Sequence, residues 1–272
     1  MYDHVHMRRP LILVHIFGLK PMHCNRRIFN YIHWFYSRFI ISYFVWFIIS
    51  QYIEIYKIFD EDISTLVSNL SISLLYLATL FKILVINGKK IDDLIKKVGK
   101  NERDTLRSED EKLKHIFIRN VHINNNLITF STSITFLTLC NYYVGPFLEE
   151  INAEPKHVSF AEDNTTRIYP VRSLPLSSWI PFNRYKYYSL SYAYHVFSAT
   201  IGGFSTLCVD VLFFSLITFG TGQLKEIQYY FEHGLSKCGA DHENCCVKSN
   251  LRSFIKIHQD IIRFGYLFNY FY

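Results

Sequence analysis

The chain has 272 residues, of which 50% are apolar, 19% are charged and 17% are aromatic. Soluble domains carry about 25% charged residues. Glycines (11) and prolines (7) are also few, so the composition excludes disordered, collagen-like and disulfide-rich classes. The net charge of +6 would favour nucleic acid if it covered a soluble surface. Because the basic residues instead separate long apolar blocks, we expect a membrane protein that contacts lipid and binds no nucleic acid.

Intervals without a charged side chain locate the apolar blocks. A helix crosses the hydrocarbon core of a membrane, about 30 Å thick, in about 20 residues. Long uncharged intervals occupy residues 63–81, 120–148 and 187–209, and a shorter one occupies 39–53. Because backbone groups in such blocks need lipid or a very large core, the pattern predicts an all-α polytopic membrane helix bundle. Its four complete spans are expected near residues 35–57, 63–86, 126–148 and 190–219.

A fifth apolar block begins near residue 258 and reaches Tyr272, where the sequence ends. After Arg263 it holds nine uncharged residues, which as a helix cover about 14 Å, or half a bilayer. We therefore expect the start of a fifth span, in a chain that is a fragment of a longer protein.

The distribution of Lys and Arg residues predicts the orientation in the membrane. Six of them lie in residues 1–38, ten in 87–120 and five in 220–257, whereas one lies in 54–62 and five lie in 149–187. Loops rich in Lys and Arg stay in the cytoplasm. We therefore predict a cytoplasmic amino terminus, cytoplasmic loops at 87–120 and 220–257, and an extracellular loop at 149–187.

Candidate modification, metal and catalytic sites are few. The sequon at Asn164 falls in the expected extracellular loop and is a candidate glycosylation site. Cys238, His242 and Cys245 are spaced loosely like zinc ligands, but no second paired module accompanies them. We therefore expect no bound metal or other cofactor. The sequence lacks a phosphate-binding loop and the GxSxG and HExxH motifs, and we predict no enzymatic activity.

Hydroxyl and aromatic side chains gather within the predicted spans, and each group has two interpretations. Ser, Thr and Asn residues repeat in the second and third spans, where they can allow close helix packing or line a mostly apolar pocket. Tyrosines gather at the outer ends of the third and fourth spans, where they can form an interfacial aromatic belt or wall an outward-open pocket. These are Tyr142, Tyr143, Tyr188, Tyr192 and Tyr194.

Three motifs, in their order along the chain, suggest a family. Residues 168–195 place a Pro, a Trp and a Pro before spaced tyrosines, which resembles the second outside loop and the beginning of the fourth span of insect odorant receptors. His195 stands where that family commonly has Gln. Residues 210–214 with 222–224 are similar to the end of the family's fourth helix, and residues 258–262 resemble the start of its fifth.

The resemblance implies a receptor with seven spans and a cytoplasmic amino terminus, located in the plasma membrane of olfactory neurons. It further implies an odorant-gated cation channel that detects small volatile apolar ligands and assembles as a hetero-tetramer with a shared co-receptor subunit. In such receptors the last helix lines the pore, and the odorant pocket lies in the outer half of the bundle. On this basis we expect the chain to end before the pore helix and to hold part of the pocket.

The expected pocket lining follows from depth in the membrane and approximate helical face. The residues are Asn69, Ile72 and Ser73 on the second span, Thr138 and Tyr142 on the third, and Tyr194, Phe197, Ser198 and Ile201 on the fourth.

Other classes of membrane protein remain as alternatives. A gustatory receptor of the same superfamily is distinguished by its final helix. A G-protein-coupled receptor has its amino terminus outside, which conflicts with the distribution of Lys and Arg. A secondary transporter has two related halves with broken helices, and the possible break at Gly202-Gly203 has no visible counterpart. A structural membrane protein without a ligand is the last alternative.

Overall fold

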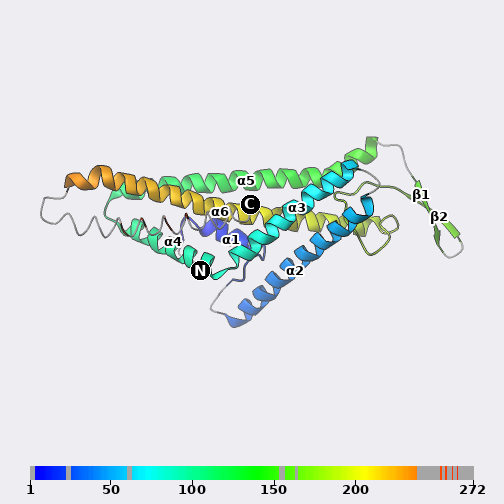
Figure 1. Ribbon diagram of the computed structural model, residues 1–272, viewed down its shortest axis with the longest axis horizontal. Coiled ribbons are helices and arrows are strands. Elements are labelled where there is room, and N and C mark those ends of the chain that lie inside the picture. The colour runs from blue at the N-terminus through cyan, green and yellow to red at the C-terminus, as the bar shows by residue number, and fades with distance from the viewer. Residues whose placement is uncertain are drawn as a thin grey trace. The chain divides into compact units, whose positions relative to one another are not determined.

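The computed structural model describes residues 4–22, 26–59, 63–152, 157–162 and 165–237, together with positions 252, 255, 259 and 262. The helices of this part of the chain are α1 (Arg8–Ile16), α2 (Arg27–Ile58), α3 (Ile63–Ile86), α4 (Lys89–Arg107), α5 (Glu111–Asn152) and α6 (Tyr188–Lys237), and its strands are β1 (His157–Glu162) and β2 (Thr165–Pro170). Figure 1 labels these elements along the chain.

Four of the described helices are long and apolar enough to cross a membrane. They are α2, residues 65–86 of α3, residues 111–148 of α5 and residues 188–229 of α6. The prediction of an all-α bundle with four complete spans is therefore confirmed. The helices α2, α5 and α6 begin before the predicted spans and also end after them, by one residue in α2, four in α5 and 18 in α6. Uncharged intervals mark the apolar part of a helix and miss its polar turns.

The segment expected as a cytoplasmic loop at 87–120 is mostly helical, since α4 fills its middle and α5 begins within it. Ile91, Leu94, Ile95 and Val98 are buried on α4. Their spacing of three and four residues forms one apolar face, and the charged residues of α4 other than Glu102 lie outside that buried face. A search for uncharged intervals cannot detect such a helix.

The segment expected as an extracellular loop at 149–187 contains a β-hairpin that the sequence analysis did not predict. Strands β1 and β2 pair antiparallel, with His157 opposite Pro170 and Glu162 opposite Thr165. Asn164 lies outside the described residues, as do Cys238, His242, Cys245 and most of the block that begins near residue 258.

The chain divides into two compact units. Unit 1 comprises residues 1–16, 83–131 and 208–272, and unit 2 comprises residues 17–82 and 132–207.

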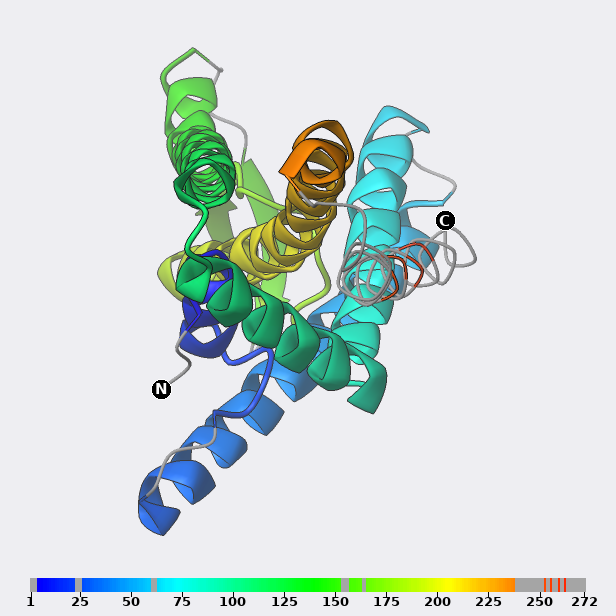
Figure 2. The same cartoon turned by 90° about the vertical axis from the view of Figure 1, so that its left-hand side faces the viewer.

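In unit 1, a buried carboxylate of α4 holds the segment before α1. Glu102 is fully buried, and its two oxygens accept the backbone N–H groups of Val5 and His6, both at 3.1 Å. Nδ1 of His4 lies 3.3 Å from the same carboxylate. Figure 2 shows the blue amino-terminal segment beside α4. Hydrogen bonds to a charged acceptor are stronger than neutral ones, so Glu102 is the main anchor of this segment.

His6 joins the same segment to the second half of α6. Its Nε2–H group donates to the backbone oxygen of Ser215 at 2.9 Å, and its backbone oxygen accepts from the side chain of Asn124 at 3.2 Å. Burial lowers the pKa of His6, while the hydrogen bond to Ser215 and the charge of Glu102 act in the opposite direction. The neutral ring is therefore the form that the fold favours.

Candidate functional site

Aromatic side chains from three helices meet in unit 2. The rings of Phe44 and Phe47 on α2 each lie 5.6 Å from the ring of Tyr76 on α3, between centroids. Phe47 also lies 6.2 Å from Tyr194 on α6. Such separations are favourable for tilted and edge-to-face rings. With Tyr43 and Phe197, whose rings are 5.1 Å apart, these residues form what we call the aromatic cluster.

A glycine lets Tyr76 reach α6. A Cβ atom at Gly202 would lie 2.5 Å from Cζ and 2.6 Å from the hydroxyl oxygen of Tyr76. No side chain fits at that distance, so α3 and α6 owe their close approach at this level to the missing side chain of Gly202. Tyr76 itself is only 7% exposed, which places the contact in the core of unit 2.

Hydroxyl pairs join the helices around the aromatic cluster. The hydroxyl oxygen of Tyr43 lies 2.7 Å from Oγ of Ser198, and that of Tyr194 lies 3.3 Å from Oγ of Ser50. The hydroxyl of Tyr143 on α5 lies 2.6 Å from Oγ1 of Thr200. Hydroxyl groups thus bond across helices in unit 2, as they do in other membrane bundles.

Several buried polar side chains next to the aromatic cluster have atoms without a hydrogen-bond partner among the described residues. These atoms are both ends of the Gln51 amide, Nδ2 of Asn69, Oγ of Ser73 and Nδ1 of His195. Gln51 follows Phe47 by one helical turn, and Ser73 precedes Tyr76 by three positions, so each lies on the helix face that carries the cluster. An unpaired buried polar group costs about 1–3 kcal/mol. A ligand with a hydrogen-bonding group would remove part of that cost.

The structure places the nine residues of the expected lining in three groups. Asn69, Ser73, Ser198 and Ile201 are buried. Ile72 and Tyr194 are half-buried. Thr138, Tyr142 and Phe197 are exposed on the described chain, Tyr142 to 39% and Phe197 to 48%.

Contacts bring part of this lining together and add residues that the sequence analysis missed. Tyr43 touches both Ser198 and Phe197, whereas Thr138 donates to the backbone oxygen of Ile134 on its own helix. The missed residues are Tyr43, Phe44, Phe47, Gln51 and Tyr76. Buried residues recur on α2 at intervals of three and four from Phe44 to Glu54, and that period was a signal available in the sequence.

The segment from residue 171 to 187 is fastened to α2 and α6 at three consecutive residues. Oγ of Ser177 donates to Glu54 at 3.4 Å, and Oγ of Ser178 lies 2.9 Å from Nε2 of His195. The backbone N–H of Trp179 donates to the backbone oxygen of Ser50 at 3.1 Å. These contacts hold the segment over the ends of the two helices, next to the buried polar side chains.

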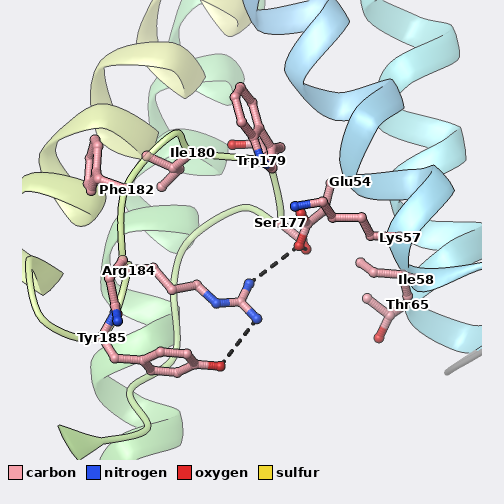
Figure 3. Close-up of a pocket in the computed structure, with 12 residues that line it drawn as sticks. Glu54, Lys57, Ile58, Thr65, Ser177, Trp179, Ile180, Phe182, Arg184 and Tyr185 are labelled. Carbon is pink, nitrogen blue, oxygen red and sulfur yellow. Dashed lines mark hydrogen bonds and ion pairs between the residues drawn. The ribbon is translucent and has the colours of Figure 1, made fainter. Parts of the chain in front are cut away.

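A cavity of about 630 Å³ opens beside this segment, at the end of α2 (Figure 3). Arg184 lies between Glu54 and the hydroxyl of Tyr185. Its Nη1 donates to Oε1 of Glu54 at 3.3 Å, and its Nη2 donates to the Tyr185 hydroxyl oxygen, also at 3.3 Å. Lys57 extends its ammonium group to 5.6 Å from the centre of the Trp179 ring. The lining residues are Glu54, Lys57, Ile58, Thr65, Ser177, Ser178, Trp179, Ile180, Phe182, Asn183, Arg184 and Tyr185.

Spanning helices with buried hydrogen-bonding groups are typical of a multi-pass membrane receptor. The sequence profile of the 7tm Odorant receptor family matches residues 62–272. The chain belongs to this family, and the resemblance noted in the sequence is confirmed. No curated protein matches the chain.

Solved structures of an insect olfactory receptor share the fold. The structure of OR5 from Machilis hrabei has 13% sequence identity and a TM-score of 0.60, and the match covers 94% of this chain and 63% of that one. The structure of the same receptor in complex with eugenol has 15% identity, a TM-score of 0.66 and the same coverage. The chain therefore spans less than two thirds of the length of the receptor that it resembles.

Proposed function

We propose that residues 1–272 form part of the transmembrane domain of an odorant receptor subunit. The match to the odorant receptor family over residues 62–272 carries this proposal, and it favours an odorant receptor over the gustatory and transporter alternatives. In this proposal the subunit lies in the plasma membrane with its amino terminus in the cytoplasm. It forms an odorant-gated cation channel with co-receptor subunits as a hetero-tetramer.

The proposed ligand site lies in unit 2, among α2, α3, α5 and α6. It consists of the nine residues of the expected lining, joined by Tyr43, Gln51 and Tyr76. Aromatic rings form the apolar surface of this site, and the unpaired side-chain groups of Asn69 and Ser73 can form hydrogen bonds with a ligand. Mostly apolar sites with a few polar anchors are typical for small molecules.

The chemistry of these residues favours a small volatile molecule with an apolar body and one or two hydrogen-bonding groups. A pure hydrocarbon would leave the buried groups of Asn69 and Ser73 unpaired, whereas an alcohol, phenol or carbonyl compound would pair them. The eugenol complex of the Machilis hrabei receptor supports a ligand of this size and polarity. Ligand binding opens a channel only if the open and closed states bind the ligand with different affinity.

Binding to the purified chain in lipid nanodiscs tests the proposal. Eugenol, 1-octanol, 2-heptanone and octane are titrated while tryptophan fluorescence is recorded. We expect saturable binding of at least one oxygen-containing compound and weaker binding of octane. Ser73→Ala removes a buried unpaired hydroxyl, and we expect it to weaken the best ligand about three- to tenfold.

Ser71→Ala provides the matched control, because Ser71 lies on the same helix but is exposed and bonds to the backbone of Val67. We expect this variant to bind like the wild type. Phe197→Ala and Tyr142→Ala test the remaining lining. We expect each variant to change the order of affinity in which the chain binds the four compounds. An unchanged order in both variants, together with equal binding by the two serine variants, would contradict the proposed site.

A further inference from the structure

Two contacts in unit 2 fix the register between α3 and α6. Tyr76 of α3 meets Gly202 of α6, and Oγ1 of Thr79 lies 3.0 Å from Oγ1 of Thr206. The position numbers increase together from the first contact to the second, so the two helices run in the same direction. Residues that precede Tyr76 and Gly202 by the same number of positions therefore lie at the same level.

Asn69 and His195 each precede this contact by seven positions. Seven residues make about two helical turns, so each residue lies about 10 Å from the contact and close to the same helix face. Asn69 is 3% exposed and His195 is 0% exposed. Nδ2 of Asn69 and Nδ1 of His195 have no hydrogen-bond partner among the described residues. The faces that α3 and α6 turn toward each other thus carry two buried nitrogens without partners.

The contact with Ser178 indicates which nitrogen of His195 carries a proton. Nε2 of His195 lies 2.9 Å from Oγ of Ser178, and this is the one hydrogen bond of that hydroxyl within the part of the chain that the structure describes. If the hydroxyl donates to Nε2, the proton of the neutral ring lies on Nδ1. The other tautomer leaves both the hydroxyl proton and Nδ1 unpaired, which costs more free energy.

Nδ1 of His195 is therefore an N–H donor, and a charged ring would carry a proton there as well. The amide nitrogen of Asn69 is also a donor. Two donors cannot bond to each other, so both nitrogens require an acceptor atom between α3 and α6.

Helix α2 adds a third buried polar group at this level. Gln51 is 0% exposed, and neither end of its amide has a partner in the described chain. Trp179 bonds to the residue before Gln51, and Ser178 bonds to His195, so one short stretch of chain holds both residues. The amide of Gln51 can donate or accept. The fixed demand for an acceptor therefore comes from Asn69 and His195.

We propose that His195 determines the class of ligand that the odorant site binds. Together with Asn69 it donates to the carbonyl oxygen of a ketone, aldehyde or ester, whose apolar body lies against the aromatic cluster. This inference rests on the proposed odorant site and adds a residue that the expected lining did not include. One carbonyl oxygen has two lone pairs and can accept both N–H groups. A hydrocarbon, or a molecule that only donates, would leave both donors unpaired.

The test compares three fluorinated probes by ¹⁹F NMR, on the 272-residue chain in phosphatidylcholine nanodiscs. The probes are 4′-fluoroacetophenone, which only accepts, 5-fluoroindole, which only donates, and 1-ethyl-4-fluorobenzene, which does neither. Empty nanodiscs measure the partitioning of each probe into lipid. We expect saturable binding of the ketone and at least about tenfold weaker binding of the other two.

Variants of His195 separate its hydrogen bond from its packing. His195→Leu should weaken the ketone about tenfold and leave the binding of 1-ethyl-4-fluorobenzene unchanged. His195→Gln keeps an N–H donor and should bind the ketone within about threefold of the wild type. His122→Leu is the matched control, because His122 is an exposed histidine of α5, and it should bind all three probes like the wild type.

A second measurement reads the tautomer without any ligand. The chain is labelled with ¹⁵N in its histidine rings, and the signals of His195 are those that disappear in His195→Gln. We expect a protonated Nδ1 and a bare Nε2. The reverse tautomer would overturn the assignment of His195 as a donor to the ligand.

The binding results separate this inference from the proposed function. Equal ketone binding by His195→Leu and the wild type, or indole binding as tight as ketone binding, would overturn the inference and leave the odorant site in place. Loss of every probe in His195→Leu would show that His195 acts only in folding, which would also overturn it. If no probe binds the wild type, the odorant site itself is contradicted, and this inference falls with it.

Discussion

The contact between Gly202 and Tyr76 gives a quantitative prediction about the core of unit 2. In Gly202→Ala the new Cβ would lie 2.5 Å from Cζ of Tyr76. The Tyr76 ring cannot move freely, because the rings of Phe44 and Phe47 pack against it. Overpacking costs about 1–3 kcal/mol, and alanine regains up to about 1 kcal/mol of helix propensity. We expect a net loss of about 1–2 kcal/mol in the free energy of unfolding.

The measurement is equilibrium unfolding in mixed micelles of SDS and dodecyl maltoside, with tryptophan fluorescence as the signal. In a Tyr76→Ala background the same glycine substitution should be neutral or stabilising, because the obstructing ring is gone. Ser71→Ala is the control, since Ser71 lies on the same helix as Tyr76 but is exposed, and it should stay within about 1 kcal/mol of the wild type. An equal loss from Gly202→Ala with and without Tyr76 would refute the reasoning.

Three further predictions concern unit 1 and the orientation of the chain. Glu102→Gln removes charge-assisted bonds worth about 2–3 kcal/mol, so amide hydrogen exchange in residues 4–16 should speed up about 30- to 150-fold, whereas the exposed Glu111→Gln should change it less than threefold. Because burial lowers the pKa of His6, its contribution to stability is complete above pH 6.5 and is lost as pH falls below that value, by at most about 1.4 kcal/mol per pH unit. His6→Gln should flatten this part of the pH profile of unfolding. Glycosidase treatment of the chain from insect cells should reduce its mass if Asn164 faces outside, and Asn164→Gln should remove that change.

The apolar spans were predictable because a lipid environment imposes a strict requirement on length and charge. The uncharged run that starts at Ile63 predicted the start of α3, and the helix begins at that residue. Helix α4 was missed because its apolar residues alternate with charges, and only its period of three and four reveals it. The β-hairpin was missed because the sequence was searched for spans and not for alternating strands.

The candidate site was less predictable, since its members come from helices that are distant in sequence. Asn69, Ser73 and Ser198 were expected at the site and are buried in unit 2. Tyr43 and Gln51 were not expected, because lining residues were chosen by membrane depth and helical face only on the second, third and fourth spans, and both residues lie on the first. The dependence of Tyr76 on Gly202 involves residues more than a hundred positions apart, and no local pattern in one sequence indicates such a pair.

The location of a bound ligand tests the central claim most directly. A diazirine derivative of eugenol is photolysed with the chain in nanodiscs, and the labelled residues are identified by mass spectrometry. The account predicts labels on residues 65–80 of α3 or 191–205 of α6 that excess eugenol suppresses. Labels confined to the exposed face of α5 around Phe136 and Leu137, unaffected by excess eugenol, would contradict it.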